Sequence, residues 1–343
     1  MLSETLAFGG RLKNKQELLK SSSGGAFTAF SDAFLDMGYA VVCASYNYDN
    51  HQQEFRLITS RKERDNARGS VYVQSILNDS FREANSWIND NPEKKLIFFG
   101  MGCQAAGFQS YAEKMGFRDR TTIVDIICHG SPSPKLWKDY VMSIEKEHGK
   151  VSVLAFRDKR YGWMNPTAYL IINGKEISIK KYTKLFYSGN ALRLSCHKCP
   201  YSTTKRNTDI TIGDFWHIED KIPEQYDENG TSLILVHSHK GKELFDKVTS
   251  SMNWFEANVD DCWQMNLERP TDISEERSNF WADYDAKGIK YIINKYGEER
   301  MIIKIIQKVR RLFNKWGGVQ TPLIILSQLE QLVIGGHMHE YAL

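Results

Sequence analysis

The chain has 343 residues, with 45 Lys and Arg against 42 Asp and Glu, so its formal net charge is +3. Hydrophobic residues make up 41% of it, which is enough for a large core and excludes disorder for the bulk of the chain. A charge this small argues against a nucleic-acid-binding protein, and no apolar run is long enough to cross a bilayer. We therefore expect a cytoplasmic protein that binds no nucleic acid.

The first half of the chain alternates between helical and strand periodicity, which indicates an α/β fold. We expect, in chain order, a helix opened by 21–25 and ending at 37, strands at 39–46 and 54–60, a helix at 80–89 capped by 78–80, a strand at 95–99, a helix reaching 115, and a strand at 121–127. A strand, helix and strand in this order make the two strands parallel. Cys103 and Cys128 should then lie together at the sheet edge where open α/β sheets bind ligands.

The second half is predicted to be richer in strands. We expect a helix at 134–147, strands at 151–157, 167–172, 175–180, 209–213 and 232–237, and a helix at 241–250. Asn173-Gly174 is the strongest two-residue hairpin signal in the chain. The predicted fold is a mixed, partly parallel sheet flanked by helices, with a β-rich second half and a C-terminal helical tail. The predicted domain boundaries are 1–150, 151–297 and 298–343.

The predicted tail has the pattern of a basic amphipathic helix. Its apolar residues keep helical spacing from Met301 to Trp316, between five Lys and Arg residues and without an acidic one. Such a helix binds an anionic membrane surface or a partner protein, which would make the protein peripheral at the inner membrane surface. The alternative is a terminal helix that packs on its own domain and exposes a basic face.

Six cysteines are too few for a disulfide scaffold. Cys43 and Cys262 lie in apolar surroundings, which is typical of structural cysteines. Cys196-His-Lys-Cys199 is a single C-x-x-C motif, and Cys103 and Cys128 would complete a set of four thiolates, which suits either zinc or a 4Fe–4S cluster. In a thioredoxin-like thiol-exchange site, the C-x-x-C motif lies at the start of a helix that directly follows a strand. Pro200 and the polar residues after it do not favour one.

Ser21 to Gly25 supply small residues, hydroxyl groups and backbone N–H groups at the start of a predicted helix. Such a segment can bind an anion, because the N–H groups and the helix dipole point at the ligand. The alternative is a simple serine cap with glycines for the turn. The segment matches neither the P-loop nor the G-x-G-x-x-G pattern.

Seven ordered motifs together resemble a known family. They are KSSSGG at 20–25, RGS with YVQS at 68–75, GMGCQ at 100–104, CHG at 128–130, FRDK at 156–159, SCHKCP at 195–200 and DITIGDFW at 209–216. In this order they resemble the coenzyme F-420 hydrogenase/dehydrogenase beta-subunit family, which also includes plant 7-hydroxymethyl chlorophyll a reductase. The resemblance covers residues 7–296.

The resemblance implies an oxidoreductase, a flavoprotein with FAD and a 4Fe–4S cluster, that moves a hydride between the flavin and an organic substrate and takes part in electron transfer. The implied cluster ligands are Cys103, Cys128, Cys196 and Cys199. The implied flavin contacts are Ser22, Ser23, Gly24 and Gly25 for the pyrophosphate and ribityl chain, Tyr72, Gln74, Ser75, Gly102 and Gln104 nearer the ring, and Gly213 and Asp214 closing the site. Residues 1–150 would form the flavin-binding half, and 151–297 the half that carries the C-x-x-C loop.

Three departures from the family pattern leave other functions open. Residues 1–20 lack the cysteines of the family's N-terminal ferredoxin domain, Val71 replaces a common lysine, and GMGCQ replaces the commoner GTPCQ. Either a separate ferredoxin-type carrier serves a naturally short chain, or a preceding segment has been removed. The alternatives are a non-catalytic iron–sulfur electron-transfer or assembly subunit without FAD, and a zinc-stabilised binding protein. The substrate would be a small-molecule hydride donor or acceptor, with coenzyme F-420 as one candidate.

His129 and two tryptophans are the remaining candidates. His129 follows a predicted cluster ligand, and its ordinary pKa of about 6.5 suits an acid that protonates the substrate. Alternatively, it only forms a hydrogen bond to the cluster or the backbone. Trp163 and Trp216 would stack on a flat ligand or, as is commoner for tryptophan, pack in the core.

Overall fold

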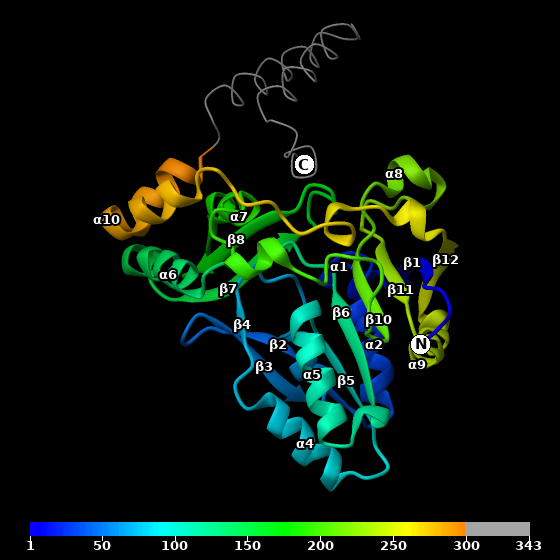
Figure 1. Cartoon of the computed structure of the whole chain (residues 1–343). Coiled ribbons are helices and arrows are strands. Elements are labelled where there is room, and N and C mark those ends of the chain that lie inside the picture. Colours follow the sequence, from blue (N-terminus) through cyan, green and yellow to red (C-terminus); the bar gives the residue numbers. More distant parts are fainter. Residues whose placement is uncertain (299–343) are drawn as a thin grey trace, which may run out of the picture.

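A nine-stranded mixed sheet forms the centre of the computed structural model, which describes residues 1–298 (Figure 1). Its strands, in spatial order, are β12 (Met252–Ala257), β1 (Leu6–Leu12), β11 (Ser232–Val236), β10 (Ile210–Asp214), β6 (Thr121–Ile126), β5 (Leu96–Met101), β2 (Ala40–Asn47), β3 (Gln52–Ile58) and β4 (Ser75–Ile76). The pairs β2–β5, β5–β6, β6–β10 and β3–β4 are parallel, and the other pairs are antiparallel. The predicted mixed, partly parallel sheet is confirmed.

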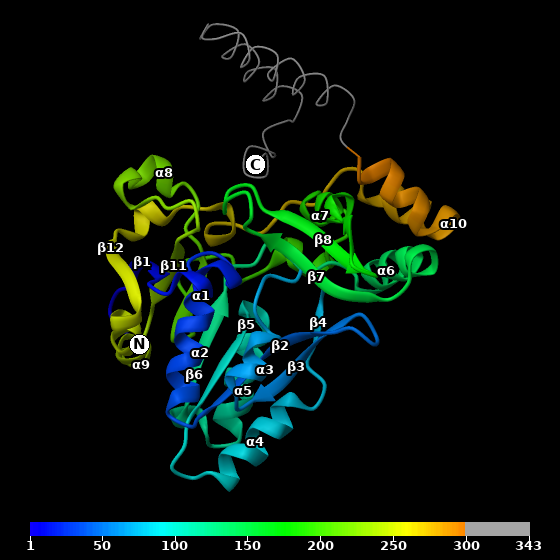
Figure 2. The ribbon, with the colours of Figure 1, turned by 180° about the vertical axis from the view of Figure 1, so that it is seen from behind.

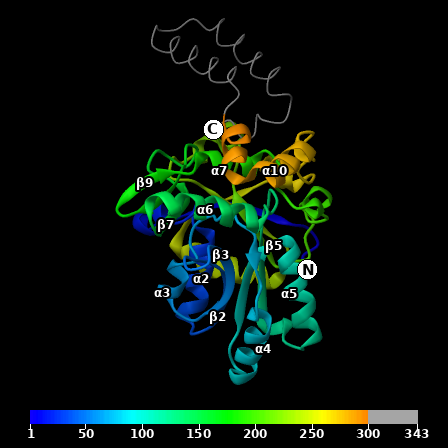
Figure 3. The same ribbon diagram turned by 90° about the vertical axis from the view of Figure 1, so that its left-hand side faces the viewer.

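Helices cover both faces of this sheet (Figures 2 and 3). One face carries α2 (Ala26–Asp36) and α9 (His239–Val248), with α1 (Lys15–Lys20) and α3 (Arg61–Asp65) beside them, and Phe30 of α2 is fully buried in this core. The other face carries α4 (Ser80–Asp90) and α5 (Gly102–Lys114), where Phe98 of β5 stacks on Phe108 of α5. Because both faces are covered, the central strands are continuous apolar runs rather than alternating ones.

A second, three-stranded antiparallel sheet contains β7 (Val151–Asp158), β8 (Thr167–Ile172) and β9 (Lys175–Ser178). It shares a core with α6 (Pro134–His148), α7 (Lys180–Tyr187) and α10 (Arg277–Tyr296). The predicted hairpin joins β8 and β9, with positive φ at both Asn173 and Gly174, as a type I′ turn requires. The end of β7 meets the end of β10, so the small sheet lies at the C-terminal edge of the large one.

The remaining short elements are α8 (Ile218–Lys221) and 3-10 turns at Arg118–Arg120, Leu194–Lys198, Pro223–Gln225, Thr249–Ser251, Val259–Cys262 and Met265–Leu267. No helix among residues 1–298 is long and apolar enough to span a membrane. Residues 299–343, with the predicted basic tail, lie outside the described residues.

Several features differ from the sequence predictions or were missed by them, including the helices α1, α3, α7 and α10. The strands β1 and β12 were not predicted; β12 is an edge strand, and β1 lies between it and β11, which comes more than 200 residues later in the chain. The predicted cap at 78–80 is wrong in detail, because Asp79 is the N-cap but its side chain accepts from Arg82 instead of from the helix backbone. The large sheet combines strands from before and after residue 150, and the boundary there stays a prediction.

Candidate functional site

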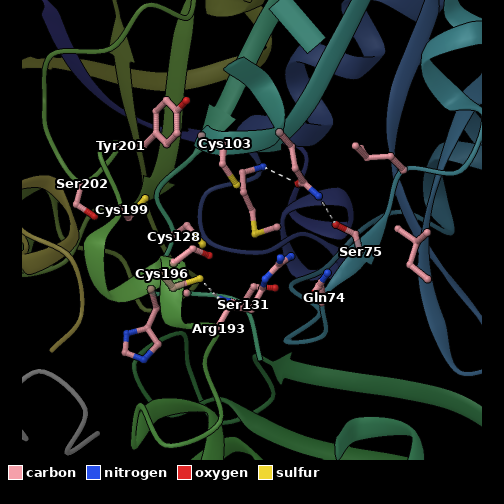
Figure 4. A pocket seen from close by; sticks show the side chains of 18 of the residues that line it. Gln74, Ser75, Cys103, Cys128, Ser131, Arg193, Cys196, Cys199, Tyr201 and Ser202 are labelled. Carbon is pink, nitrogen blue, oxygen red and sulfur yellow. Dashed lines mark hydrogen bonds between the residues drawn. The ribbon is translucent and has the colours of Figure 1, made fainter. Parts of the chain in front are cut away.

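A cavity of about 480 Å³ opens at the C-terminal ends of β5 and β6 (Figure 4). Its lining comes from four segments, namely 74–78, 101–104, 128–131 and 193–206. These segments meet because β5 and β6 are parallel neighbours, with Met101 opposite Ile126 in the register, so the chain leaves both strands at one edge. No acidic residue lines the cavity within the part of the chain that the structure describes.

All four predicted cluster ligands line this cavity. Cys103 lies in the first turn of α5 and Cys128 follows β6, while Cys196 and Cys199 come from the turn at Leu194–Lys198 and the residue after it. Figure 4 shows these four cysteines on one side of the cavity and Gln74 and Ser75 on the other. The expected proximity of Cys103 and Cys128 is therefore confirmed.

Burial makes two of the four thiols, Cys103 and Cys128, hold their protons more firmly than an exposed cysteine does. The backbone N–H of Ser131 donates to the sulfur of Cys196 at 3.3 Å. Burial, and in second place the neighbouring Cys196, raises the pKa of the Cys128 thiol to about 12, although the backbone N–H of Gly130 opposes both effects. Burial also raises the pKa of Cys103. Metal binding would therefore have to displace protons from Cys128 and Cys103.

A single zinc ion and a four-iron cluster require different spacings of the ligand sulfurs. Among the described residues, no three of these cysteine sulfurs lie within 4.8 Å of one another. A single zinc ion binds each sulfur at about 2.3 Å, so its ligand sulfurs lie at most roughly 4.6 Å apart. In a four-iron cluster each thiolate binds a different iron, which requires a wider spacing.

Four of the predicted flavin contacts share the cavity with the cysteines. They are Gln74, Ser75, Gly102 and Gln104. The Gln104 side chain donates to the hydroxyl oxygen of Ser75 at 2.8 Å and accepts from the Met101 backbone N–H at 3.1 Å. These bonds fix the start of α5 against β4, and so hold the polar side of the cavity next to Cys103.

The predicted pyrophosphate segment does not line the cavity, and much of it is engaged in internal contacts. The backbone N–H groups of Gly24 and Ala26 donate to the Ser232 hydroxyl at 2.9 and 3.4 Å. The Ser23 hydroxyl donates to the Thr231 carbonyl at 2.7 Å, and the Ser22 hydroxyl lies 3.0 Å from that of Ser70. The segment is therefore held against β11, and Ser22 faces the 68–70 turn.

Two buried cations hold the other predicted flavin contacts together, and neither was identified as a site residue from the sequence. Lys159 donates to the carbonyl oxygens of Leu18, Ser23 and Asn229 at 2.7 to 2.8 Å. Arg157 forms an ion pair with Asp214, whose other carboxylate oxygen accepts from Trp163 at 2.7 Å. The only signal for these cations was the FRDK motif, which gives no role for its residues.

Tyr72 and Gly213 lie around this ion pair rather than in the cavity. Tyr72 is stacked on Phe186, and its hydroxyl lies 2.8 Å from that of Tyr187. Gly213 precedes Asp214 at the end of β10, and a Cβ there would lie 2.6 Å from the Ile127 side chain. The predicted flavin contacts therefore fall into two groups, one in the cavity and one packed behind it.

His129 lines the cavity, but its surroundings do not favour a charged ring. The Thr271 hydroxyl lies 3.2 Å from its Nδ1 and donates to its carbonyl oxygen at 2.6 Å. Burial lowers its pKa to about 4, so the ring is neutral near pH 7. Its catalytic role stays a prediction. Trp163 is fully buried and stacks on Trp216, with ring centroids 5.2 Å apart, as core residues do.

The comparison with known protein families agrees with the motifs. No curated protein sequence matches the chain. Among solved structures, it is similar to a chain of the xenon-derivatised F420-reducing NiFe hydrogenase complex from Methanosarcina barkeri, at 18% identity and a TM-score of 0.48, over 93% of this chain and 96% of that chain. Residues 93–260 match the family described as the C terminus of the coenzyme F420 hydrogenase/dehydrogenase beta subunit. These residues, which include all four cavity cysteines, are therefore similar in sequence to the coenzyme F420 hydrogenase/dehydrogenase beta-subunit family.

Proposed function

We propose that the protein is an oxidoreductase that uses FAD and a 4Fe–4S cluster to move a hydride to or from an organic substrate. The observation that carries this proposal is that four cysteines and four predicted flavin contacts line a single cavity. When bound there, a flavin exchanges two electrons as a hydride, and a cluster exchanges one electron at a time. Their proximity would allow the protein to convert between the two.

The residues that line the cavity and those packed behind it have different roles in this proposal. Cys103, Cys128, Cys196 and Cys199 hold the cluster, and the backbone N–H groups at 130 and 131 stabilise two of the thiolates. Gln104, fixed by Ser75, orients the flavin beside Cys103. The ion pair of Arg157 and Asp214 and the three bonds of Lys159 keep the Ser22–Gly25 segment and the end of β10 in place for the rest of the FAD.

The substrate is proposed to be a small-molecule hydride donor or acceptor, with coenzyme F-420 as the candidate that the family name suggests. The cavity suits a neutral or anionic molecule, because Arg193 lines it and no acidic residue does so within residues 1–298. The electron partner is proposed to be a ferredoxin-type carrier in the cytoplasm. Contact of the basic tail with a membrane or a partner is a further proposal, which falls on residues 299–343.

His129 is proposed as the acid that protonates the substrate. Because burial favours its neutral ring, His129 would hold a proton from solvent only while a negative charge lies in the cavity, and would then donate that proton to the substrate. A His129→Gln variant is expected to keep its flavin and cluster but to lose turnover. Full turnover in that variant would exclude the acid role and leave His129 with the Thr271 hydrogen bond as its function.

An anaerobic absorption spectrum of the purified protein tests the proposed function, with iron, sulfide and released flavin measured on the same sample. The expected result is about one FAD, four iron and four sulfide per chain, and a broad cluster band that bleaches on reduction. Zinc without either chromophore would contradict the proposal and would indicate a zinc-stabilised binding protein.

A second candidate is an iron–sulfur electron-transfer or assembly subunit without FAD. One observation favours it, because Ser232 already occupies the N–H groups of Gly24 and Ala26 that would bind a pyrophosphate. Cluster without flavin in the same assay would support this candidate. A Ser232→Ala variant that gains flavin would show that these N–H groups are the site of competition.

A further inference from the structure

We propose that the buried ion pair of Arg206 and Asp125 sets the reduction potential of the cluster by placing a fixed positive charge beside its ligand loops. The inference rests on the proposed function, because it needs a cluster on the four cysteines. Arg206 and Asp125 are not ligands in this proposal. Arg206 supplies the positive charge, and Asp125 holds the Arg206 guanidinium in place.

The ion pair lies among three of the ligand-bearing segments. Arg206 comes from the loop that follows Cys199, and Asp125 lies in β6 three residues before Cys128. The Nη1 atom of Arg206 donates to Asp125, and the two side chains are only 3% and 0% exposed. A Cβ added to Gly102, the residue before Cys103, would lie 2.9 Å from the same Nη1 atom. The guanidinium therefore lies directly against the backbone that carries Cys103.

Hydrogen bonds on both sides prevent this cation from turning away. Arg206 also donates through Nε to the Thr203 carbonyl at 2.8 Å. The second oxygen of Asp125 accepts from the hydroxyls of Thr208 and Thr211 at 3.1 and 2.5 Å. Because Arg206 lines the cavity and Asp125 does not, the positive end of the pair faces the cysteines.

Electrostatics then gives the direction of the effect. One-electron reduction adds one negative charge to the cluster, and no proton leaves Arg206, because a guanidinium stays charged in proteins. A nearby cation in a buried, low-dielectric site stabilises the reduced form more than a solvent-exposed one would. Arg206 should therefore raise the reduction potential, and Asp125, lying behind it, should oppose this effect more weakly.

If the ion pair were only structural, it would hold the loops together without affecting the reduction potential. Two single variants, each of which removes one of the two opposite charges, distinguish this role from the electrostatic one. Arg206→Gln leaves Asp125 as the nearest charge, and Asp125→Asn leaves Arg206 without its counter-ion. We expect the equilibrium constant for cluster reduction to fall at least fivefold in the first and to rise at least threefold in the second. Tenfold corresponds to about 59 mV for one electron.

The measurement is an anaerobic redox titration of the full chain with its cluster, followed by electron paramagnetic resonance at one pH. Arg206→Lys, which keeps the charge, is expected to stay within twofold of the wild type. The double variant Asp125→Asn/Arg206→Gln avoids an unpaired buried charge, and its reduction potential is expected to lie between those of Arg206→Gln and the wild type, below that of Arg206→Lys. Lys198→Gln is the matched control, because this exposed lysine lies between two ligands and is screened by water.

Each outcome decides between the possibilities. Shifts in opposite directions for the two single variants support the inference. Shifts in the same direction, or none in a protein that holds its cluster, overturn it and leave the ion pair as a brace. If the single variants lose iron, the test compares the Arg206→Lys variant with the double variant. Equal reduction potentials in these two variants would overturn the inference. Absence of a cluster from the wild type would instead refute the proposed function.

Discussion

His237 should make the stability of this protein depend on pH below neutrality. Its ring is only 3% exposed, with Nδ1 3.0 Å from the Thr5 hydroxyl and Nε2 2.9 Å from the Thr211 hydroxyl. Burial, and in second place the nearby Arg206, lowers its pKa to about 4, against an ordinary value of 6.5. A protonated ring would be a buried charge between two hydroxyl groups, one of which already donates to Asp125.

The magnitude follows from this difference in pKa. Because the folded-state pKa is the lower one, the unfolded chain binds the proton first as the pH falls. The contribution of His237 to stability is therefore fully present above about pH 6.5, decreases as the pH falls towards 4, and changes no further below that value. At roughly 1.4 kcal/mol per pKa unit, the total loss is about 3 kcal/mol, of which about 2 kcal/mol is reached by pH 5.

Urea denaturation at pH 7.5, 6 and 5 measures this effect as a difference between variants. His237→Gln cannot bind the proton, so its free energy of unfolding should fall by about 2 kcal/mol less than that of the wild type between pH 7.5 and 5. His148→Gln is the matched control, because His148 lies on the surface with half of its side chain exposed, and it should follow the wild type. Parallel pH profiles for the wild type and His237→Gln would refute the reasoning.

Three further predictions concern the site and its supports. Cys199→Ala should lose cluster iron while Cys43→Ala, in the core beside α2, keeps it, and an iron assay in which both variants behave alike would contradict the ligand assignment. Gly24→Ala should lower the free energy of unfolding by about 1–3 kcal/mol, because the new Cβ would lie 2.0 Å from a backbone carbonyl oxygen of β1. Gly107→Ala lies in α5, and its new Cβ would have no atom within 4 Å, so this variant should raise the free energy of unfolding by up to about 1 kcal/mol. The two variants are therefore expected to change the melting temperature in opposite directions. Lys159→Met should release flavin but not iron, because the substitution leaves three carbonyl oxygens of the flavin-side loops without their donor, and Lys159 bonds to no cysteine. Equal loss of both cofactors would show that the substitution merely unfolds the protein.

The sequence predicted only those parts of the candidate site that follow from the order of neighbouring strands, helices and motifs along the chain. The spacing of strand, helix and strand around Cys103 and Cys128 implied parallel neighbours, and the chirality of such units leaves few other arrangements. These two cysteines could then be grouped with the C-x-x-C motif, because a site of this kind takes four thiolate ligands. By contrast, the motifs gave no sign that the predicted flavin contacts would separate into a group in the cavity and a group packed behind it.

The sequence by itself determined the α/β class, the type of most elements and the four cysteines, because hydrophobic period, turn residues and ligand spacing are local properties of a chain. Only the tertiary structure decided that β1 pairs between β11 and β12, that Ser232 binds the N–H groups of Gly24 and Ala26, and that Arg206 meets Asp125 across 81 positions. These contacts depend on which strands become neighbours. Partners so distant along the chain leave no period or motif in the sequence, and their energies are realised only once the surrounding core excludes water.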